Sequence, residues 1–357
     1  MINQKEITSR WISKVSKANK NADKILIEKV IRALLLLEGL VKQKIEFTFK
    51  GGTALMLHFN STKRLSIDID IILPKENKEL NNVLDEAAKE QGFNKKEFQT
   101  RTAASGITKS HYKFYYSPLY KTNKVEDYVL LDILFEKINY QNIIQLPITS
   151  GFVPTIDAPL LVSIPSLEDI LGDKLTAFAP NTTGVPYFKN ENSMSMEIIK
   201  QLYDIGNLFD RVENLSVIKN TFSKFVETEL EYRKIKDCKQ QNVIEDIYQT
   251  ALTIASRGID GNGDFEQLQL GVQRIKSYIF SERFNIEKAI VSASKAAYLS
   301  TLIKYDKNKI EKYSNKMQMR DWIIDKPVNT KLNKLKKSNP EAFFYWYKIY
   351  QLRKQKN

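Results

Sequence analysis

The sequence predicts an α+β fold, in which a mixed sheet with flanking helices is followed by a helical domain. Residues 45–165 alternate the apolar patterns of strands and helices. From Ser166 onward, nearly every periodic stretch has the spacing of a helix. Residues 1–44 have the pattern of amphipathic helices. We therefore divide the chain of 357 residues into 1–44, 45–165 and 166–357, because this length allows more than one hydrophobic core.

Apolar residues in the N-terminal segment recur at helical spacing. They form one stripe, made of Ile27, Val30, Ile31, Leu34 and Leu35. Such a stripe needs an apolar partner, and we expect the sheet to provide it. Within the core segment, the residues between Tyr112 and Tyr128 predict an insertion rich in β-hairpins.

A pair of glycines separates a predicted strand from a predicted helix. Phe47 and Phe49 alternate with polar residues, which predicts a half-buried strand that ends at Gly51. The apolar residues that follow Thr53 have helical spacing. Backbone N–H groups at the start of a helix attract anions, and glycines let a phosphate approach closely. Gly51 and Gly52 therefore predict a phosphate-binding turn.

Two carboxylates follow this turn on one predicted strand. Asp68 and Asp70 lie two positions apart, so their side chains project from the same side of a strand. The alternate positions face a core, and they are Ile67, Ile69 and Ile71. Carboxylates held this close need a cation, and oxygen ligands together with substrate phosphates select Mg²⁺ or Mn²⁺. Two such ions clamp the attacking and leaving oxygens of an in-line displacement, so the pattern indicates nucleotide chemistry.

The glycine and aspartate blocks together resemble the nucleotidyltransferase fold of the DNA polymerase β type. A narrower resemblance is to the AbiEii/AbiGii toxin family, the toxin half of abortive-infection, type IV toxin–antitoxin pairs. It is carried by Lys50-Gly51-Gly52-Thr53 and Arg64-Leu65-Ser66-Ile67-Asp68-Ile69-Asp70, which are similar to the Lys-Gly-Gly-Thr and Arg-Phe-Ser-x-Asp-x-Asp blocks of that family. The resemblance implies nucleotide binding by the residues around the two aspartates, namely Lys50, Gly51, Gly52, Thr53, Arg64 and Ser66.

Two further blocks of the family have counterparts downstream. Asp173-Lys174-Leu175-Thr176-Ala177 is similar to its Lys-x-x-Ala helix, and Lys200-Gln201-Leu202-Tyr203-Asp204-Ile205 to its Arg-Asp-x-Tyr-Asp block. The chain departs from the pattern at Lys200 and Gln201, where the family usually has Arg and Asp. The resemblance covers roughly residues 45–210.

These downstream blocks supply further candidate site residues. The resemblance implies that Lys174 contacts the triphosphate and that Lys200 also binds the nucleotide. For Asp204 it implies a catalytic role, in which the carboxylate orients Lys174 or a metal-bound water. Lys174 lies on an otherwise apolar helical face, so the alternative is a lysine that snorkels from the rim of the core.

The third carboxylate of the predicted metal site comes from an apolar strand. Residues 128–136 read Tyr-Val-Leu-Leu-Asp-Ile-Leu-Phe-Glu, so Asp132 interrupts an apolar run. Burial of an acid there costs free energy unless the acid is paired or bound to a metal. We expect Asp132 to complete the metal site and to accept the proton of the acceptor hydroxyl. Glu136 points to the same face and is the alternative.

Positive charge is concentrated at the C-terminal end. The formal net charge is +13, and residues 304–357 carry 15 Lys and Arg against 5 Asp and Glu, a difference of +10. This segment also contains the aromatic run 343–347. Basic side chains match phosphates and aromatic side chains stack on unpaired bases, which favours an RNA acceptor. The alternative is a solvated basic face with the aromatic residues in a core.

Cysteine, histidine and apolar content indicate the cellular compartment and argue against a zinc site. A single cysteine, Cys238, excludes an intrachain disulfide, and no stretch reaches the apolar length of a transmembrane helix. The N-terminus lacks the apolar region of a signal peptide, so we expect a cytoplasmic protein without a membrane partner. His58 and His111 are too few and too far apart in the sequence to indicate a zinc site.

These observations predict a nucleotidyltransferase that uses Mg²⁺ or Mn²⁺ to move a nucleoside monophosphate from an NTP to an acceptor. The resemblance implies the 3′ end of tRNA as the acceptor, inhibition of translation and growth, and an antitoxin encoded nearby. One alternative is a small-molecule nucleotidyltransferase of the antibiotic-modifying type, against which the basic tail argues. The other is a non-catalytic RNA-binding protein, which leaves the clustered carboxylates without a purpose.

Overall fold

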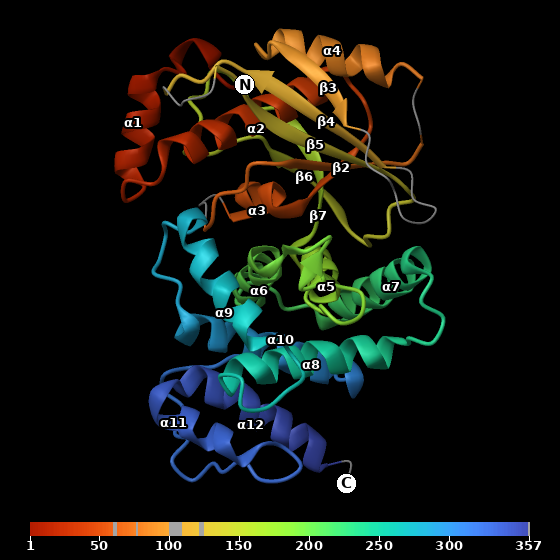
Figure 1. Cartoon of the computed structure of the whole chain (residues 1–357), viewed down its shortest axis with the longest axis vertical. Helices are drawn as coiled ribbons and strands as arrows, with labels where there is room; N and C mark the ends of the chain where they lie inside the picture. Colours follow the sequence, from red (N-terminus) through yellow and green to blue (C-terminus); the bar gives the residue numbers. More distant parts are fainter. Residues whose placement is uncertain (60–62, 76–77, 100–108, 121–124, 356–357) are drawn as a thin grey trace. The chain divides into compact units, whose positions relative to one another are not determined.

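The structure is a computed structural model that divides into two compact units (Figure 1). The first unit consists of Met1–Ser166 together with Ser277–Arg283, and the second of Leu167–Lys276 and Phe284–Asn357. The residues that the structure describes are 1–59, 63–75, 78–99, 109–120 and 125–355.

A five-stranded mixed sheet forms the centre of the first unit, in the order β1-β2-β5-β4-β3. β2 and β5 run parallel, and the other neighbouring strands are antiparallel. Their bounds are β1 (Thr48–Lys50), β2 (Ile69–Leu73), β3 (Lys95–Gln99), β4 (Lys109–Tyr116) and β5 (Asp127–Phe135). Together with the helices, this mixed sheet confirms the predicted α+β class.

Helices cover one face of this sheet. α2 (Lys24–Lys42) and α4 (Leu80–Glu90) pack on each other and on the strands, and α1 (Ser9–Ala18) packs on α2 (Figure 1). All five residues of the predicted N-terminal stripe are buried in the core that α2 shares with the sheet. This shared core is the apolar partner that the stripe needs.

The remaining elements of the first unit are short. A 3-10 turn, η1 (Gln4–Glu6), precedes α1, and α3 (Gly51–Phe59) follows β1 directly. β6 (Ile143–Pro147) and β7 (Leu161–Pro165) form a separate two-stranded antiparallel sheet. The expected strand and helix on either side of Lys50 and Gly51 are thus present, although the strand begins at Thr48.

A short segment from late in the chain completes the first unit. Leu65 N donates a hydrogen bond to Tyr278 O at 2.7 Å, and Ser281 Oγ donates one to Lys63 O at 2.7 Å. Lys20 Nζ in turn donates to Ser281 O at 2.7 Å. Residues 277–283 therefore fix the backbone that leads into Asp68.

The hairpin predicted between Tyr112 and Tyr128 is present, since β4 and β5 are consecutive strands that pair antiparallel, but it belongs to the central sheet and is not an insertion. The two ends of this segment belong to β4 and β5, which pair over the whole length of β4 in the middle of the sheet. Its half-exposed aromatic residues alternate with buried neighbours such as Phe114 and Val129, because one face of the strands is covered by helices.

The second unit is helical apart from a two-stranded hairpin, β8 (Phe188–Lys189) and β9 (Asn192–Ser193). α10 (Ile286–Lys304) is its central helix and packs against α6, α8 and α12. The other helices are α5 (Leu167–Ala177), α6 (Ser195–Phe209), α7 (Leu215–Arg233), α8 (Gln240–Ala255), α9 (Phe265–Arg274), α11 (Leu335–Ser338) and α12 (Pro340–Lys354), with the 3-10 turn η3 (Thr330–Lys334). The 3-10 turn η2 (Ile275–Tyr278) begins in this unit and ends in the first.

The aromatic run of the C-terminal segment lies inside this helical unit. Phe343, Phe344, Tyr345 and Trp346 are each at most 1% exposed. Tyr345 packs edge-on against Phe209 of α6, with ring centroids 5.1 Å apart. The expectation that these residues stack on unpaired bases is therefore wrong for these four positions, because they form a core. In the part of the chain that the structure describes, no helix is long and apolar enough to cross a membrane.

Candidate active site

Four cross-strand partners form a row across the sheet of the first unit. Lys50 is opposite Asp70, Asp70 is opposite Asp132, and Asp132 is opposite His111. Residues opposite each other on neighbouring strands point to the same face and lie about 4.8 Å apart. The pairing register therefore brings the carboxylates of Asp70 and Asp132 together, although they are 62 residues apart in the sequence.

The row lies on the face of the sheet that α2 and α4 leave uncovered, which we call the open face. Leu131 and Ile133, the neighbours of Asp132 in β5, are at most 1% exposed and belong to the core with α2. The Asp132 side chain is 34% exposed. Solvent and a ligand thus have access to the carboxylates, while the alternate side chains hold the strand in place.

The glycine turn lies directly against Asp70. Gly51 has a φ of +83°, and a Cβ at this position would collide with Asp70 Oδ2. A Cβ on Gly52 would lie 2.6 Å from a terminal nitrogen of Arg64 and 2.7 Å from Ser66 Oγ. Only glycine combines this backbone conformation with such close neighbours. The predicted phosphate-binding turn, Asp70, Arg64 and Ser66 therefore form one cluster.

Thr53 and Asp68 are linked through the backbone. Thr53 is fully buried, and its Oγ1 donates a hydrogen bond of 2.6 Å to Asp68 O. The Thr53 hydroxyl therefore anchors the residue that leads into β2 and does not face an open site. Asp68 itself precedes β2 and is half-buried.

Two of the basic residues of the predicted nucleotide site, Arg64 and Lys50, contact neighbours within the first unit. Arg64 is 7% exposed, and its guanidinium donates to Leu65 O at 3.3 Å. Lys50 Nζ lies 6.0 Å from the centroid of the Tyr140 ring. Both cations therefore belong to the first unit near the glycine turn.

His111 is a residue of this row that sequence reasoning missed. Its Nδ1 donates a hydrogen bond of 2.6 Å to Asp132 Oδ1, and its side chain is 13% exposed. A lone histidine in a strand carries no local signal. Only the register of β4 on β5, which the sequence does not reveal, places it opposite the carboxylate.

The geometry also distinguishes between Asp132 and Glu136 as candidates for the third carboxylate. Glu136 follows the last residue of β5, and its backbone N–H donates to Leu73 O at 3.2 Å. Asp132 is the direct partner of Asp70. The structure therefore favours Asp132 over Glu136 as the carboxylate beside Asp70.

The donors of the open face fit a divalent cation that completes its coordination with other ligands. Across the described residues, no group of three or more His, Cys, Asp and Glu side chains is arranged to hold a metal ion. Mg²⁺ in nucleotide sites takes one or two protein carboxylates and completes its octahedron with phosphate oxygens and water. The adjacent carboxylates of Asp70 and Asp132 match that requirement in number and in chemistry.

Three predicted site residues belong to the second unit. Lys174 of α5 forms an ion pair with Asp204 of α6, with 2.8 Å between Nζ and Oδ2, and donates to Gln201 Oε1 at 3.1 Å. Lys174 and Asp204 are 6% and 3% exposed. Lys200 pairs instead with Glu197, at 2.9 Å. Lys174 is thus a buried, paired lysine and does not snorkel to solvent.

A family model matches residues 35–285, which include every predicted site residue from Lys50 to Asp204. Its description is nucleotidyl transferase AbiEii toxin, type IV toxin–antitoxin system. The chain belongs to the AbiEii nucleotidyltransferase toxin family. The match confirms the resemblance that the glycine and aspartate blocks indicated, and it extends to the returning segment 277–283.

Comparison with solved structures gives more distant similarities. The nucleotidyltransferase toxin MenT4 from Mycobacterium tuberculosis H37Rv is similar with a TM-score of 0.49 and 12% identity, over 95% of this chain and 98% of that one. JHP933 from Helicobacter pylori is similar with a TM-score of 0.41 and 15% identity, over 80% and 94% of the two chains. No curated protein matches the sequence.

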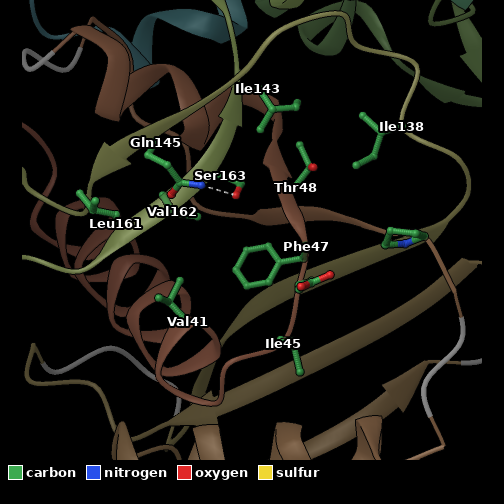
Figure 2. Close-up of a pocket in the computed structure, with 12 residues that line it drawn as sticks. Val41, Ile45, Phe47, Thr48, Ile138, Ile143, Gln145, Leu161, Val162 and Ser163 are labelled. Carbon is green, nitrogen blue, oxygen red and sulfur yellow. Dashed lines mark hydrogen bonds between the residues drawn. The ribbon is translucent and has the colours of Figure 1, made fainter.

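A cavity of about 370 Å³ lies elsewhere in this AbiEii-family chain (Figure 2). It is lined by residues around the start of β1 and by the β6–β7 hairpin, including Phe47, Thr48, Ile143 and Gln145. Gln145 Nε2 donates to Ser163 Oγ across the hairpin at 2.7 Å (Figure 2). None of the predicted site residues lines this cavity, so the candidate active site is the open face of the sheet.

Proposed function

We propose that this AbiEii-family protein transfers a nucleoside monophosphate from an NTP to the 3′ end of tRNA and thereby inhibits translation and growth. The observation that carries the proposal is the placement of Asp70 between Asp132 and the Gly51 turn. This arrangement puts two carboxylates beside backbone groups suited to bind phosphate. Family membership supports nucleotidyl transfer, and the sequence resemblance is the basis for the tRNA acceptor.

The glycine turn and the carboxylates have separate roles: the turn binds phosphates and the carboxylates bind the cation. Backbone N–H groups of Gly51 and Gly52 receive the β- and γ-phosphates at the start of α3, where the helix dipole favours negative charge. Arg64 and Ser66, both within reach of Gly52, add contacts to the same phosphates. Asp70 and Asp132, with Asp68 before them, hold Mg²⁺ or Mn²⁺. When bound, the cation would neutralise charge on the phosphates and on the leaving group.

Transfer requires one proton to leave the acceptor. The acceptor hydroxyl attacks the α-phosphorus, the bond to the β-phosphate oxygen breaks, and pyrophosphate leaves. Asp132 accepts the hydroxyl proton as the new P–O bond forms. His111 holds Oδ1 of this carboxylate, which leaves Oδ2 to accept the proton. Catalysis thus depends on positioning and on charge neutralisation.

The remaining assignments come from the family resemblance. We assign Lys174 to the triphosphate, Lys200 to nucleotide binding and Asp204 to orientation of Lys174. The 2.8 Å ion pair between Lys174 and Asp204 is consistent with that last role. We further propose that the protein acts in the cytoplasm and that an antitoxin encoded nearby counteracts it, as in other type IV systems.

The direct test is incorporation of label into RNA. Purified protein is incubated with total RNA, Mg²⁺ and each α-labelled NTP in turn, and parallel reactions contain EDTA or the Asp70→Asn variant. We expect label at the 3′ end of tRNA with at least one NTP, and none in the two controls. Absence of transfer with every NTP in both Mg²⁺ and Mn²⁺ would refute the proposed activity, and label in another RNA would refute the tRNA assignment.

A further inference from the structure

A second cluster of side chains occupies the open face of the sheet, beside the carboxylates. Tyr115 of β4 is opposite Tyr128 of β5. Tyr128 lies four residues before Asp132, and Tyr115 lies four residues after His111. Because side chains alternate along a strand, all four project from the same face. The two rings are 5.7 Å apart with an interplanar angle of 59°.

Lysines surround these two rings. Lys113 Nζ lies 4.7 Å from the centroid of the Tyr128 ring, and Lys95 Nζ of β3 lies 4.6 Å from that of Tyr115. Lys95 also pairs with Glu126 at 2.8 Å. Glu97 of β3 is opposite Lys113, and the Tyr115 hydroxyl together with the charges of Lys113 and Lys95 lowers the pKa of its carboxyl. The cluster therefore combines aromatic surface with two lysines and one carboxylate.

The two rings are partly exposed. Both tyrosines are half-buried, whereas Tyr116 and Val129 on the opposite face are 1% exposed under α2. Tyr115 donates a hydrogen bond of 2.8 Å to Glu97 Oε2, and this bond raises the pKa of the Tyr115 hydroxyl above its ordinary value. The hydroxyl thus remains protonated, and the charge of the neighbouring Glu97 carboxylate is offset by Lys113 and Lys95.

We propose that Tyr115, Tyr128 and Lys113 form a platform that binds the single-stranded 3′ end of the acceptor RNA. Aromatic side chains on a sheet stack on unpaired bases, and neighbouring lysines contact the phosphates between them. The inference rests on the proposed transfer to RNA, and it assigns a subsite for the acceptor. A cross-strand aromatic pair also stabilises a sheet, but that role needs neither partial exposure nor lysines next to the rings.

The distance from the platform to the carboxylates matches the length of a few stacked nucleotides. Four residues of a strand from Tyr128 to Asp132 span about 13 Å, which corresponds to about four stacked nucleotides at ~3.4 Å each. An RNA strand whose terminal hydroxyl lies at Asp132 therefore places its preceding bases over Tyr128 and Tyr115. Recognition through stacking accepts any base, so the platform selects single-stranded ends more than sequence.

Binding of RNA without transfer provides the test. The probe is a single-stranded RNA oligonucleotide with 2-aminopurine near its 3′ end, whose fluorescence is quenched when the base stacks. It is titrated with the full-length protein in the absence of NTP and divalent metal. We expect quenching by wild type and by Tyr128→Phe. For Tyr128→Leu and Lys113→Gln we expect affinity about tenfold lower, and for Tyr128→Leu loss of the quenching.

Tyr120→Leu is the matched control. Tyr120 belongs to the same unit, is half-buried and has Lys24 Nζ 4.9 Å from its ring, but it is outside the open-face strands. We expect its binding to equal that of wild type. Wild-type affinity and quenching in both Tyr128→Leu and Lys113→Gln would overturn the platform, as would an equal loss in Tyr120→Leu.

The same samples separate this inference from the proposed function. Asp70→Asn should bind the oligonucleotide normally yet transfer no label, because Asp70 is outside the platform. If wild type transfers no label to RNA but binds the probe through Tyr128, the transfer proposal fails and the platform stands as an RNA-binding surface. If transfer occurs and Tyr128→Leu binds normally, only the platform fails.

Discussion

His111 donates a 2.6 Å hydrogen bond to Asp132, the residue directly opposite it on the neighbouring strand. The bond fixes the orientation of the carboxylate and occupies one of its two oxygens. Residues that hold a metal-binding carboxylate in this way typically affect metal affinity or activity by about 10- to 100-fold. We therefore expect His111 to act as a positioning residue for Asp132.

His111→Ala should lower kcat for nucleotide transfer by about 10- to 100-fold and weaken Mn²⁺ binding, with little change in KM for the NTP. His111→Asn retains an amide donor near the position of Nδ1 and should restore most of the activity. Steady-state kinetics and Mn²⁺ titration followed by electron paramagnetic resonance measure the two effects. Equal activity in the Ala and Asn variants, at either level, would contradict a positioning role.

The difference between His111 and Asp132 shows which parts of the site the sequence reveals. Asp132 stands out because an acid interrupts an apolar strand, and Gly51 because a diglycine separates a strand from a helix. His111 has no such local signal, since its role comes from strand register. The register also decides between Asp132 and Glu136, which have the same parity in the sequence.

Prediction of the fold is also limited to features that have a local signal in the sequence. The apolar stripe in α2 and the helical spacing after Ser166 predict their elements correctly, because they depend on local periodicity. The run 343–347 gave the wrong prediction of base stacking, because a basic, aromatic composition is equally compatible with a surface and with a helix core. Burial of Trp346 against Tyr248 of α8, with ring centroids 5.6 Å apart, depends on long-range packing that no local window contains.

Loss of either central carboxylate should abolish transfer without unfolding the protein. Asp70→Asn and Asp132→Asn remove charge from a partly exposed site and leave no cavity. We expect kcat/KM to fall by about a thousandfold or more, equivalent to about 4 kcal/mol of transition-state stabilisation. Label incorporation measures the activity, and circular dichroism confirms the fold. If transfer causes growth arrest, expression of either variant should permit growth, and arrest by an inactive variant would separate toxicity from transfer.

Gly51→Ala should inactivate the protein because the added methyl group meets Asp70. The substitution combines the cost of a positive φ, about 1 kcal/mol, with a collision against the carboxylate. Gly92→Ala is the matched control, since Gly92 has a φ of +72° and no neighbouring atom lies within 4 Å of the position that a Cβ would occupy. We expect similar small losses of stability from the backbone, but a loss of activity in Gly51→Ala alone. Full activity in Gly51→Ala would show that close contact between the turn and Asp70 is not needed.

The buried pair of Lys174 and Asp204 predicts an effect on stability as well as on nucleotide use. Lys174→Ala leaves the Asp204 carboxylate buried without its ammonium partner, which should cost about 3–5 kcal/mol of unfolding free energy. Lys174→Met with Asp204→Leu removes both charges at similar volume and should recover most of that stability, as measured by urea unfolding. If Lys174 contacts the triphosphate, the stable double variant should still bind a non-hydrolysable NTP weakly in isothermal titration. Wild-type NTP affinity in the double variant would assign the pair to the core of the helical unit and remove Lys174 from the nucleotide site.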